Sequence, residues 1–269
     1  MKTEFNSVTL SNDLKKKIKG KVLFDEFSRG RYSTDASLYQ IKPIGVVLPK
    51  DQFDVLNIIE YSQKNSIPLL ARGGGSSQCG QTVGECIVLD YSKYQNKILE
   101  FNAKEKFVWV EPGIVLDQLN EYLKPHGLWF PVDVSTSSRA TIGGMTGNNS
   151  CGSRSLYYGN MVNNVLAVES ILDDGSIHTF ENIDKNYLSK TNDQNRKFQI
   201  IKKCIDIREQ VENEINEHWP KTQRRVGGYN IDLINPNGFN SSNILVGSEG
   251  TLSLFCLLYT SPSPRDLST

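Results

Sequence analysis

The stretch LLARGGGSSQCGQT, residues 69–82, decides the fold because it reads as a strand that runs into a glycine turn. An apolar strand at 44–48 and a helix at 51–65 precede it. The three segments predict a βαβ unit whose turn lies at the carboxyl end of a strand, where open α/β sheets bind their ligands. Residues 73–82 are called the glycine loop below.

The glycine loop has the spacing of a P-loop, G-x-x-x-x-G-K-[ST], but lacks two of its parts. The lysine position holds Gln81, so no ammonium group is available for β- or γ-phosphates. The β-branched Val83, Ile87 and Val88 predict a strand where a P-loop continues as a helix. The glycines at 73–75 still let backbone N–H groups turn toward an anion. The loop favours an amide cradle for a diphosphate over a nucleoside triphosphatase, with a turn of no chemical role as the alternative.

A second segment, TIGGMTGNNSCG at 141–152, is also rich in small residues. Its glycines let the backbone approach a ligand, and its Asn and Ser side chains offer hydrogen bonds. We expect the two segments, on different lobes, to enclose an extended dinucleotide.

Composition excludes several other classes. The 269 residues carry 30 basic and 30 acidic side chains, which gives no general attraction to nucleic acid or anionic membrane. The N-terminal residues lack the apolar region of a secretory signal, and no apolar run approaches the roughly 20 residues of a membrane span. The five cysteines form no C-x-x-C pair, so neither a zinc nor an iron–sulfur site is indicated. We expect reduced thiols in a cytoplasmic protein, with docking at a membrane surface left open.

Helices and strands are mixed along the chain. Residues 97–113 and 165–180 predict hairpins, the second around an Asp-Gly turn, and residues 195–219 predict a long helix. The pattern predicts an α+β protein of two lobes. The expected parts are an N-terminal helical extension (1–39), a first lobe (about 40–110) and a second lobe (about 111–255).

Five segments in a fixed order carry a resemblance to a known family. They are PLLARGGGSSQCGQ (68–81), VEPGIVLDQLN (110–120), FPVDVSTSSRATIGGMTGNNSCGSRSLYYG (130–159), RRVGGYNIDLI (224–234) and LVGSEGTL (245–252). Over residues 30–255 the chain resembles the FAD-binding PCMH-type domain of the FAD-linked oxidases, which has the vanillyl-alcohol-oxidase fold. It is most similar to the D-lactate, glycolate and D-2-hydroxyglutarate dehydrogenase branch. The STSSRATIGGM segment resembles the long bacterial members with a C-terminal iron–sulfur domain.

The resemblance implies a lobe with a small parallel or mixed sheet and a lobe with an antiparallel sheet flanked by helices, with FAD between them. The implied FAD contacts are Arg72, Gly73, Gly74, Gly75, Ser76, Ser77, Gly80, Gln81, Pro112, Gly113, Pro131, Asp133, Thr141, Gly143, Gly144, Asn149, Gly152, Tyr158, Gly159, Val168, Glu249 and Gly250. Ser76 stands where some relatives carry a flavin-linking histidine. Serine has no imidazole nitrogen, so we expect FAD to be held without a covalent bond at this turn.

Structural alternatives remain open for several of these residues. Gly143 and Gly144 also fit a close helix contact, and Asn149 also fits a helix cap. Tyr158 also fits the core, and Asp133 also fits a surface turn.

The implied reaction is oxidation of a D-2-hydroxy acid of the D-lactate or D-2-hydroxyglutarate type to the 2-oxo acid, with hydride transfer to flavin N5. In the family the base and the substrate ligands lie mainly in a cap domain after GSEGTL, so we expect no catalytic residue in this chain and no turnover without that domain. None of His126, His178 and His218 matches a catalytic histidine. Arg224 and Arg225 fit either a carboxylate clamp or a solvated turn.

Alternative functions are another flavin-dependent alcohol or sugar oxidase on this fold and a non-catalytic FAD-binding subunit or module. The hydroxy acid and the electron acceptor stay open, and an iron–sulfur cluster is expected only downstream, if at all. The last stretch, CLLYTSPSPRDLST at 256–269, resembles translated adapter sequence. We expect native sequence to end near Phe255, with a genuine flexible C-terminus as the alternative.

Overall fold

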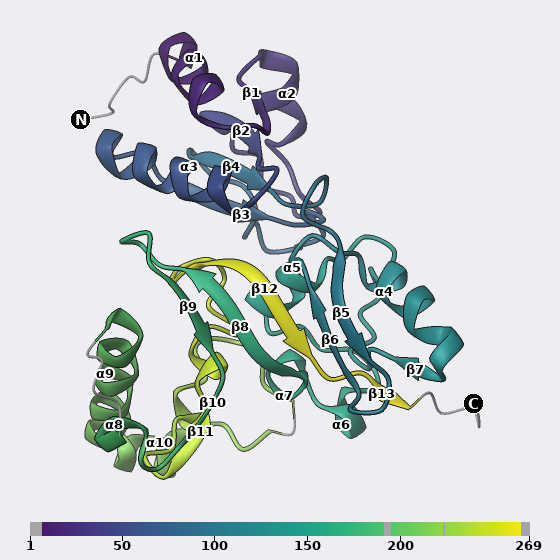
Figure 1. Cartoon of the computed structure of the whole chain (residues 1–269), viewed down its shortest axis with the longest axis vertical. Helices are drawn as coiled ribbons and strands as arrows, with labels where there is room; N and C mark the ends of the chain where they lie inside the picture. The colour runs from purple at the N-terminus through teal and green to yellow at the C-terminus, as the bar shows by residue number, and fades with distance from the viewer. Residues whose placement is uncertain (1–6, 191–194, 223, 265–269) are drawn as a thin grey trace. The chain divides into compact units, whose positions relative to one another are not determined.

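The computed structural model describes residues 7–190, 195–222 and 224–264 (Figure 1). The chain divides into two compact units, and each is described by itself. Unit 1 takes residues 1–97, 111–117 and 136–144, and unit 2 takes residues 98–110, 118–135 and 145–269. Both units combine helices with sheets, which confirms the predicted α+β class.

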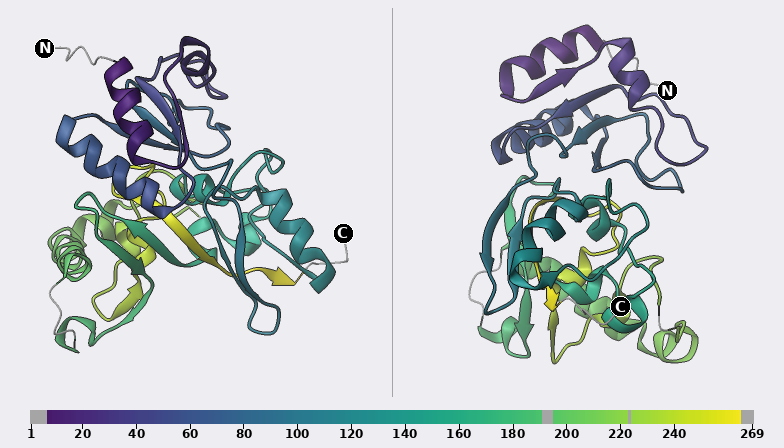
Figure 2. Two further views of the ribbon diagram at one scale, coloured as in Figure 1. Left: turned by 45° about the horizontal axis from the view of Figure 1, so that its top comes forward. Right: turned by 90° about the vertical axis from the view of Figure 1, so that its right-hand side faces the viewer.

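Unit 1 is built on a four-stranded mixed sheet with the order β1–β2–β4–β3. Strand β1 is antiparallel to β2, whereas β2 and β3 both run parallel to β4. Helix α3 joins β2 to β3, so the predicted βαβ unit is confirmed, and α1 packs beside α3 (Figure 2). The elements are α1 (Ser7–Lys17), β1 (Lys21–Leu23), α2 (Glu26–Arg31), β2 (Gly45–Leu48), α3 (Gln52–Asn65), β3 (Leu69–Arg72) and β4 (Ile87–Asp90).

The core of unit 1 lies on the two central strands. Val46 and Leu48 of β2 pack with Val88 of β4 and with Cys86, the residue that precedes β4. Every residue of β2 and β4 is buried, as expected for a strand that is covered on both faces. Burial raises the pKa of the Cys86 thiol to about 12, which keeps it neutral.

The N-terminal residues are built into unit 1 through a buried carboxylate. Asp54, on the first turn of α3, accepts hydrogen bonds from the N–H groups of Lys19 at 2.7 Å, Gly20 at 2.8 Å and Lys50 at 2.8 Å. These bonds fix the turn between α1 and β1 to the start of α3. Residues 7–39 share the sheet and the helix layer of unit 1, whereas the sequence analysis expected a separate extension at 1–39.

Unit 2 is built on a five-stranded antiparallel sheet with the order β5–β6–β12–β8–β9. Leu258 lies in register with Val110 on one side and with Val168 on the other, and all three side chains are fully buried. The elements after β4 are β5 (Ile98–Asn102), β6 (Phe107–Val110), α4 (Leu116–Leu123), η1 (Lys124–His126), β7 (Leu128–Trp129), α5 (Ile142–Gly147), α6 (Ser155–Tyr158), α7 (Met161–Asn164), β8 (Val165–Ile171), β9 (Ile177–Phe180), β10 (Asn182–Asp184), α8 (Tyr187–Lys190), α9 (Arg196–Gln210), α10 (Glu212–His218), η2 (Ile231–Leu233), β11 (Gly238–Asn240), η3 (Ser241–Ile244), β12 (Leu254–Thr260) and β13 (Ser263–Pro264).

Two boundaries differ from the sequence-based expectation. The hairpin 98–110 belongs to the sheet of unit 2, because β6 pairs with β12, so the first lobe does not extend to 110. The predicted long helix at 195–219 is broken at Val211, which separates α9 from α10.

The segment after Phe255 also differs from an irregular tail. Strand β12 runs to Thr260 between β6 and β8 (Figure 1), and Cys256 and Leu258 are buried in it. The apolar run at 254–259 forms this strand, and the Ser/Pro-rich residues begin only after it. The expectation that 256–269 is non-native stays a prediction, and its last five residues lie outside the described residues.

Within the ranges that the structure describes, no helix has both the length and the apolar character needed to cross a bilayer.

Candidate cofactor site

The glycine loop of unit 1 leaves the carboxyl end of β3 and turns back toward β4. Gly75 has φ +64° and Gly80 has φ +78°, a left-handed conformation that glycine adopts without strain. The N–H groups from Gly73 to Gln78 donate no hydrogen bond to any residue in the described part of the chain. Successive backbone N–H groups around a left-handed residue can form a concavity that binds anions, and these six N–H groups are available for that role.

The loop packs against the segment that leads into α5, and this contact excludes side chains. A Cβ at Gly73 would lie 2.0 Å from Oγ1 of Thr141, and a Cβ at Gly74 would lie 2.1 Å from the carbonyl oxygen of Arg139. Within unit 1 the structure therefore brings together three predicted contacts, Gly73, Gly74 and Thr141. Glycine is required here for close backbone packing as well as for the turn.

The first turn of α5 offers little to an anion, because protein groups already use its N–H groups. Gly143 donates to the carbonyl oxygen of Pro112 at 2.8 Å, and Gly144 donates to Oγ1 of Thr141 at 3.2 Å. A Cβ at Gly143 would lie 2.6 Å from Cβ of Pro112. These contacts match the close-packing alternative for the two glycines.

The Pro112–Gly113 turn is held by the segment after β4. Gly113 donates to the carbonyl oxygen of Gln95 at 2.7 Å, and a Cβ on Gly113 would lie 2.2 Å from the carbonyl oxygen of Tyr91. Gly113 therefore positions the turn through backbone contacts.

The guanidinium of Arg72 binds backbone carbonyl oxygens in residues 32–34 and at the end of the glycine loop. It donates to Tyr32 at 3.3 Å, to Thr34 at 2.7 Å and to Thr82 at 3.0 Å. The guanidinium also lies 5.2 Å from the centre of the Tyr32 ring. Burial lowers the pKa of Arg72, against the attraction of Asp35 and Asp90. The side chain thus joins the start of the loop to its end.

The remaining predicted residues of the loop are half-buried: Ser76, Ser77, Gly80 and Gln81. Ser77 accepts a hydrogen bond from the N–H of Cys79 at 3.3 Å. A Cβ at Gly80 would lie 2.7 Å from the Tyr39 ring. Residues 32–39, a segment that the sequence analysis did not connect to the loop, therefore contact it.

In unit 2, Asn149 has the geometry of a helix cap. It follows α5 with φ +49°, and its N–H donates to the carbonyl oxygen of Thr146 at 3.1 Å. Its fully buried side chain accepts from the N–H of Val162 at 3.0 Å and donates to Oδ1 of Asn230 at 3.4 Å. The side-chain amide is used by protein partners on both sides, which matches the helix-cap alternative.

Asp133 and Gly152 meet in a second packed turn of unit 2. The carboxylate of Asp133 accepts from the hydroxyl of Ser153 at 2.6 Å and from the N–H of Arg154 at 3.0 Å. A Cβ at Gly152 would lie 2.1 Å from Oδ1 of Asp133. Pro131, two residues before, is buried. Asp133 therefore organises the turn at 152–154, as its surface-turn alternative expects.

Three further predicted contacts lie in packed surroundings. Tyr158 is half-buried, with its ring edge-on to Trp129 at 5.5 Å. Gly159 has φ +79°, and a Cβ there would lie 2.5 Å from Oδ1 of Asn163. Val168 is fully buried in the middle of β8, between β12 and β9. The side chain of Val168 is therefore part of the core of unit 2.

The GSEG turn closes the end of α5. Gly247 donates to the carbonyl oxygen of Thr146 at 3.0 Å, and Glu249 donates to that of Gly147 at 2.9 Å. Glu249 and Gly250 have φ values of +50° and +78° and are exposed. The turn supplies the C-terminal carbonyls of the helix with donors that the helix itself lacks.

Arg224 and Arg225, the candidate carboxylate clamp, also contact protein groups. Arg224 donates to the carbonyl oxygen of Gly152 at 2.8 Å, and Arg225 pairs with Asp232 at 2.5 Å while lying over the Trp219 ring. The two guanidinium groups therefore bind different protein groups and are not arranged to bind one substrate carboxylate together.

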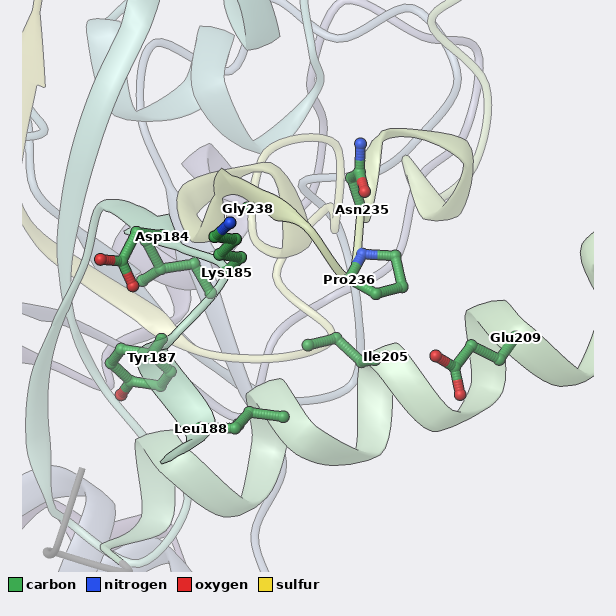
Figure 3. Close-up of a pocket in the computed structure, with 10 residues that line it drawn as sticks. Asp184, Lys185, Tyr187, Leu188, Ile205, Glu209, Asn235, Pro236 and Gly238 are labelled. Carbon is green, nitrogen blue, oxygen red and sulfur yellow. The ribbon is translucent and has the colours of Figure 1, made fainter. Parts of the chain in front are cut away.

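A separate cavity of about 150 Å³ lies in unit 2 between α8, α9 and the β10–β11 pair (Figure 3). Ile183, Leu188 and Ile205 line it with Lys185 and Glu209. None of its lining residues is a predicted FAD contact, so the cavity is distinct from the glycine loop.

Comparison with known proteins identifies the family. The sequence model of the FAD-binding domain family matches residues 43–181, which is more than half of the chain. The chain belongs to the FAD-binding domain family. In this family member, the glycine loop, its packing partners Arg139 and Thr141, and the Pro112–Gly113 turn all fall inside the matched region.

Curated relatives of this FAD-binding domain include two dehydrogenases. D-2-hydroxyglutarate dehydrogenase of Haemophilus influenzae is 36% identical over 239 residues, which cover 83% of this chain and 23% of the relative. D-lactate dehydrogenase of Archaeoglobus fulgidus is 31% identical over 83% of this chain and 40% of the relative. The chain thus spans about a quarter of the length of the first of these relatives and two fifths of the second.

A solved structure confirms the fold. Alkyldihydroxyacetonephosphate synthase aligns with the whole chain at a TM-score of 0.69 and 18% identity, and the alignment covers 42% of that protein.

Proposed function

We propose that this chain is the FAD-binding part of a flavin-dependent dehydrogenase that oxidises a D-2-hydroxy acid, of the D-lactate or D-2-hydroxyglutarate type, to the 2-oxo acid. Bound FAD would accept a hydride from the substrate carbon that carries the hydroxyl group. The family membership and the names of the two dehydrogenase relatives support the proposal.

The observation that carries the proposal is the run of free N–H groups from Gly73 to Gln78. A diphosphate presents several anionic oxygens a few ångströms apart, and consecutive N–H groups bind such oxygens without a lysine. The guanidinium of Arg72 is held by protein carbonyls, so the backbone supplies the donors. The residues present therefore fit the pyrophosphate of FAD.

We assign two roles to the predicted contacts. Residues 73–78 would bind the pyrophosphate directly through the backbone. Others would keep the surrounding turns in place without direct contact to FAD: Arg72, Asp133, Gly143, Asn149 and Gly152. The hydrogen bonds and Cβ distances given above support this division.

We also propose that FAD is bound without a covalent link. Ser76 has no imidazole nitrogen to form the link at its position. Acid precipitation tests this point, because a non-covalent flavin stays in the supernatant. A yellow pellet would overturn the proposal, and the exposed thiol of Cys79 in the same loop would then be replaced by serine to locate the link.

The chemical step needs a general base for the hydroxyl proton and cationic groups for the carboxylate. Arg224 and Arg225 are occupied by protein partners. This chain covers 23% of the Haemophilus influenzae dehydrogenase, and we propose that the base and the substrate ligands belong to the part of such a polypeptide that this chain does not cover.

Ligand titration tests the function. FAD added to the purified chain should quench its fluorescence with micromolar affinity. ADP should compete with FAD and riboflavin should not, because the diphosphate is the recognised group. Absence of FAD binding at 100-fold excess over protein would contradict the proposal. The dehydrogenase activity is tested on the full-length protein with D-lactate, D-2-hydroxyglutarate and glycolate and an artificial electron acceptor.

A further inference from the structure

A segment upstream of the matched family region contacts the glycine loop at its turn and at its end. Residues 32–39, called the upstream segment, precede the match at 43–181. The N–H of Ala36 donates to the carbonyl oxygen of Gly75 at 3.1 Å, at the left-handed residue of the turn. The carboxylate of Asp35 accepts from the hydroxyl of Thr82 at 3.0 Å and from its N–H at 3.4 Å.

Arg72 closes this set of contacts into a ring. Its guanidinium joins the carbonyl oxygens of Tyr32 and Thr34 in the upstream segment to that of Thr82 at the end of the loop. The hydroxyl of Tyr32 in turn donates to Asp90 at the end of β4, at 2.5 Å. The loop is thus held at its start, its turn and its end by one short stretch of chain.

Asp35 remains ionised in this position. Burial would raise its pKa, but hydrogen bonds from Ser37 and Thr82 outweigh burial and lower it below the usual value. A carboxylate is a stronger acceptor than a neutral group, so it suits the paired donors of Thr82.

We propose that the upstream segment is a second part of the diphosphate site and that Asp35 is its positioning residue. Asp35 holds Thr82, and the neighbouring Ala36 holds Gly75, so the loop keeps the curvature that aims the N–H groups of residues 73–78 at one anion. This inference rests on the proposed FAD function. Ordering a free backbone on binding costs conformational entropy, and a loop that is already ordered avoids this cost.

The experiment compares four single variants of the 269-residue chain by fluorescence titration with FAD. D35A should weaken FAD binding by about tenfold. T82V, which removes only the hydroxyl donor, should weaken it by a smaller factor, whereas T82S should bind like the unaltered chain. The matched control is D174A. Asp35 accepts a hydrogen bond from the N–H of Ser37 two residues on, at 2.8 Å, and Asp174 likewise accepts from the N–H and hydroxyl of Ser176, at 2.9 Å and 2.5 Å, in an exposed hairpin of unit 2.

Two further readouts separate positioning from a general structural role. D35A combined with T82V should weaken binding no more than D35A alone, because both substitutions remove the same hydrogen bond between the Thr82 hydroxyl and Asp35. Amide hydrogen exchange at residues 73–78 should be faster in D35A and T82V and normal in T82S and D174A. T82V keeps the test valid even where D35A does not fold.

The outcomes distinguish the inference from the function it rests on. If the unaltered chain does not bind FAD, both are overturned. If it binds FAD and D35A and T82V bind as tightly as D174A, only the positioning role is overturned. Equal weakening by T82V and T82S also contradicts it, since the hydroxyl would then have no part.

Discussion

The glycine loop and the segment 141–152 have similar composition, but the structure uses them differently. Both are rich in glycine and small polar residues, and both were predicted to contact FAD. In the loop, the N–H groups from Gly73 to Gln78 have no partner among the described residues. In the second segment, Gly143, Gly144 and Asn149 donate to protein oxygens.

The comparison shows what small residues do and do not reveal. Glycine marks a place where backbone comes close to another group, and the partner is either a ligand or another part of the protein. The hydrogen bonds of the N–H groups distinguish these two cases, because a buried donor nearly always has a partner. A donor with no protein partner is available to a ligand. We therefore expect changes in the loop to alter FAD affinity and changes in the second segment to alter stability.

The largest effect is expected at Gly74. A methyl group there would lie 2.1 Å from the carbonyl oxygen of Arg139, a backbone atom that cannot move aside alone. We expect Gly74→Ala to displace the loop and weaken FAD binding by about 100-fold, or about 2.7 kcal/mol. Gly30→Ala is the matched control in unit 1, because a Cβ there meets no atom within 4 Å. Equal affinity of the two variants would contradict the cradle.

Asn149→Ala should lower stability while leaving affinity nearly unchanged. It removes two buried side-chain hydrogen bonds and places alanine at φ +49°. We expect a loss of about 2–3 kcal/mol in the free energy of unfolding. Urea unfolding measures the loss, and FAD titration well below the transition measures affinity. A large drop in affinity with unchanged stability would restore Asn149 as a direct contact.

Much of unit 1 was predictable from the sequence because its signals are local. The strands at 45–48, 69–72 and 87–90 and the helix at 52–65 follow from apolar runs and the glycine turn. The unit boundaries were not predictable, because they depend on backbone bonds between distant residues. Residues 111–117 join unit 1 through bonds such as that from Gly113 to Gln95, and residues 136–144 join residues 111–117 through the bond from Leu116 to Ala140.

The upstream segment and β12 were missed for different reasons. Asp35 reaches Thr82 across 47 positions, and the only local signal was an aspartate in a turn. Strand β12 was overlooked because the Ser/Pro-rich residues beyond it dominated the composition of the C-terminal stretch.

A smaller effect is expected at Asp133. Its carboxylate holds the turn at 152–154 through Ser153 and Arg154 at a partly exposed site. Asp133→Ala should lower the free energy of unfolding by about 1 kcal/mol and change FAD affinity less than twofold. Chemical unfolding and FAD titration check both values. A loss of affinity larger than the Gly74→Ala effect would reverse the roles of the two segments.

The smallest effect separates the cysteines. Cys79 is exposed in the glycine loop, whereas Cys86 is buried with its pKa raised to about 12. At pH 8 iodoacetamide should modify Cys79, while Cys86 stays protonated and inaccessible until the protein unfolds. Saturating FAD should slow the modification of Cys79 severalfold, as mass spectrometry of the loop peptide would show. Unchanged labelling at saturation would place FAD away from the loop.

Amide chemical shifts test the central claim most directly. In ¹⁵N-labelled protein titrated with FAD, the resonances of residues 73–78 should move to new positions and their hydrogen exchange should slow as the diphosphate binds. ADP should move the same resonances. The N–H resonances of Gly143, Gly144 and Asn149, which already donate to protein oxygens, should shift less. Saturation with FAD that leaves residues 73–78 unchanged would contradict the account.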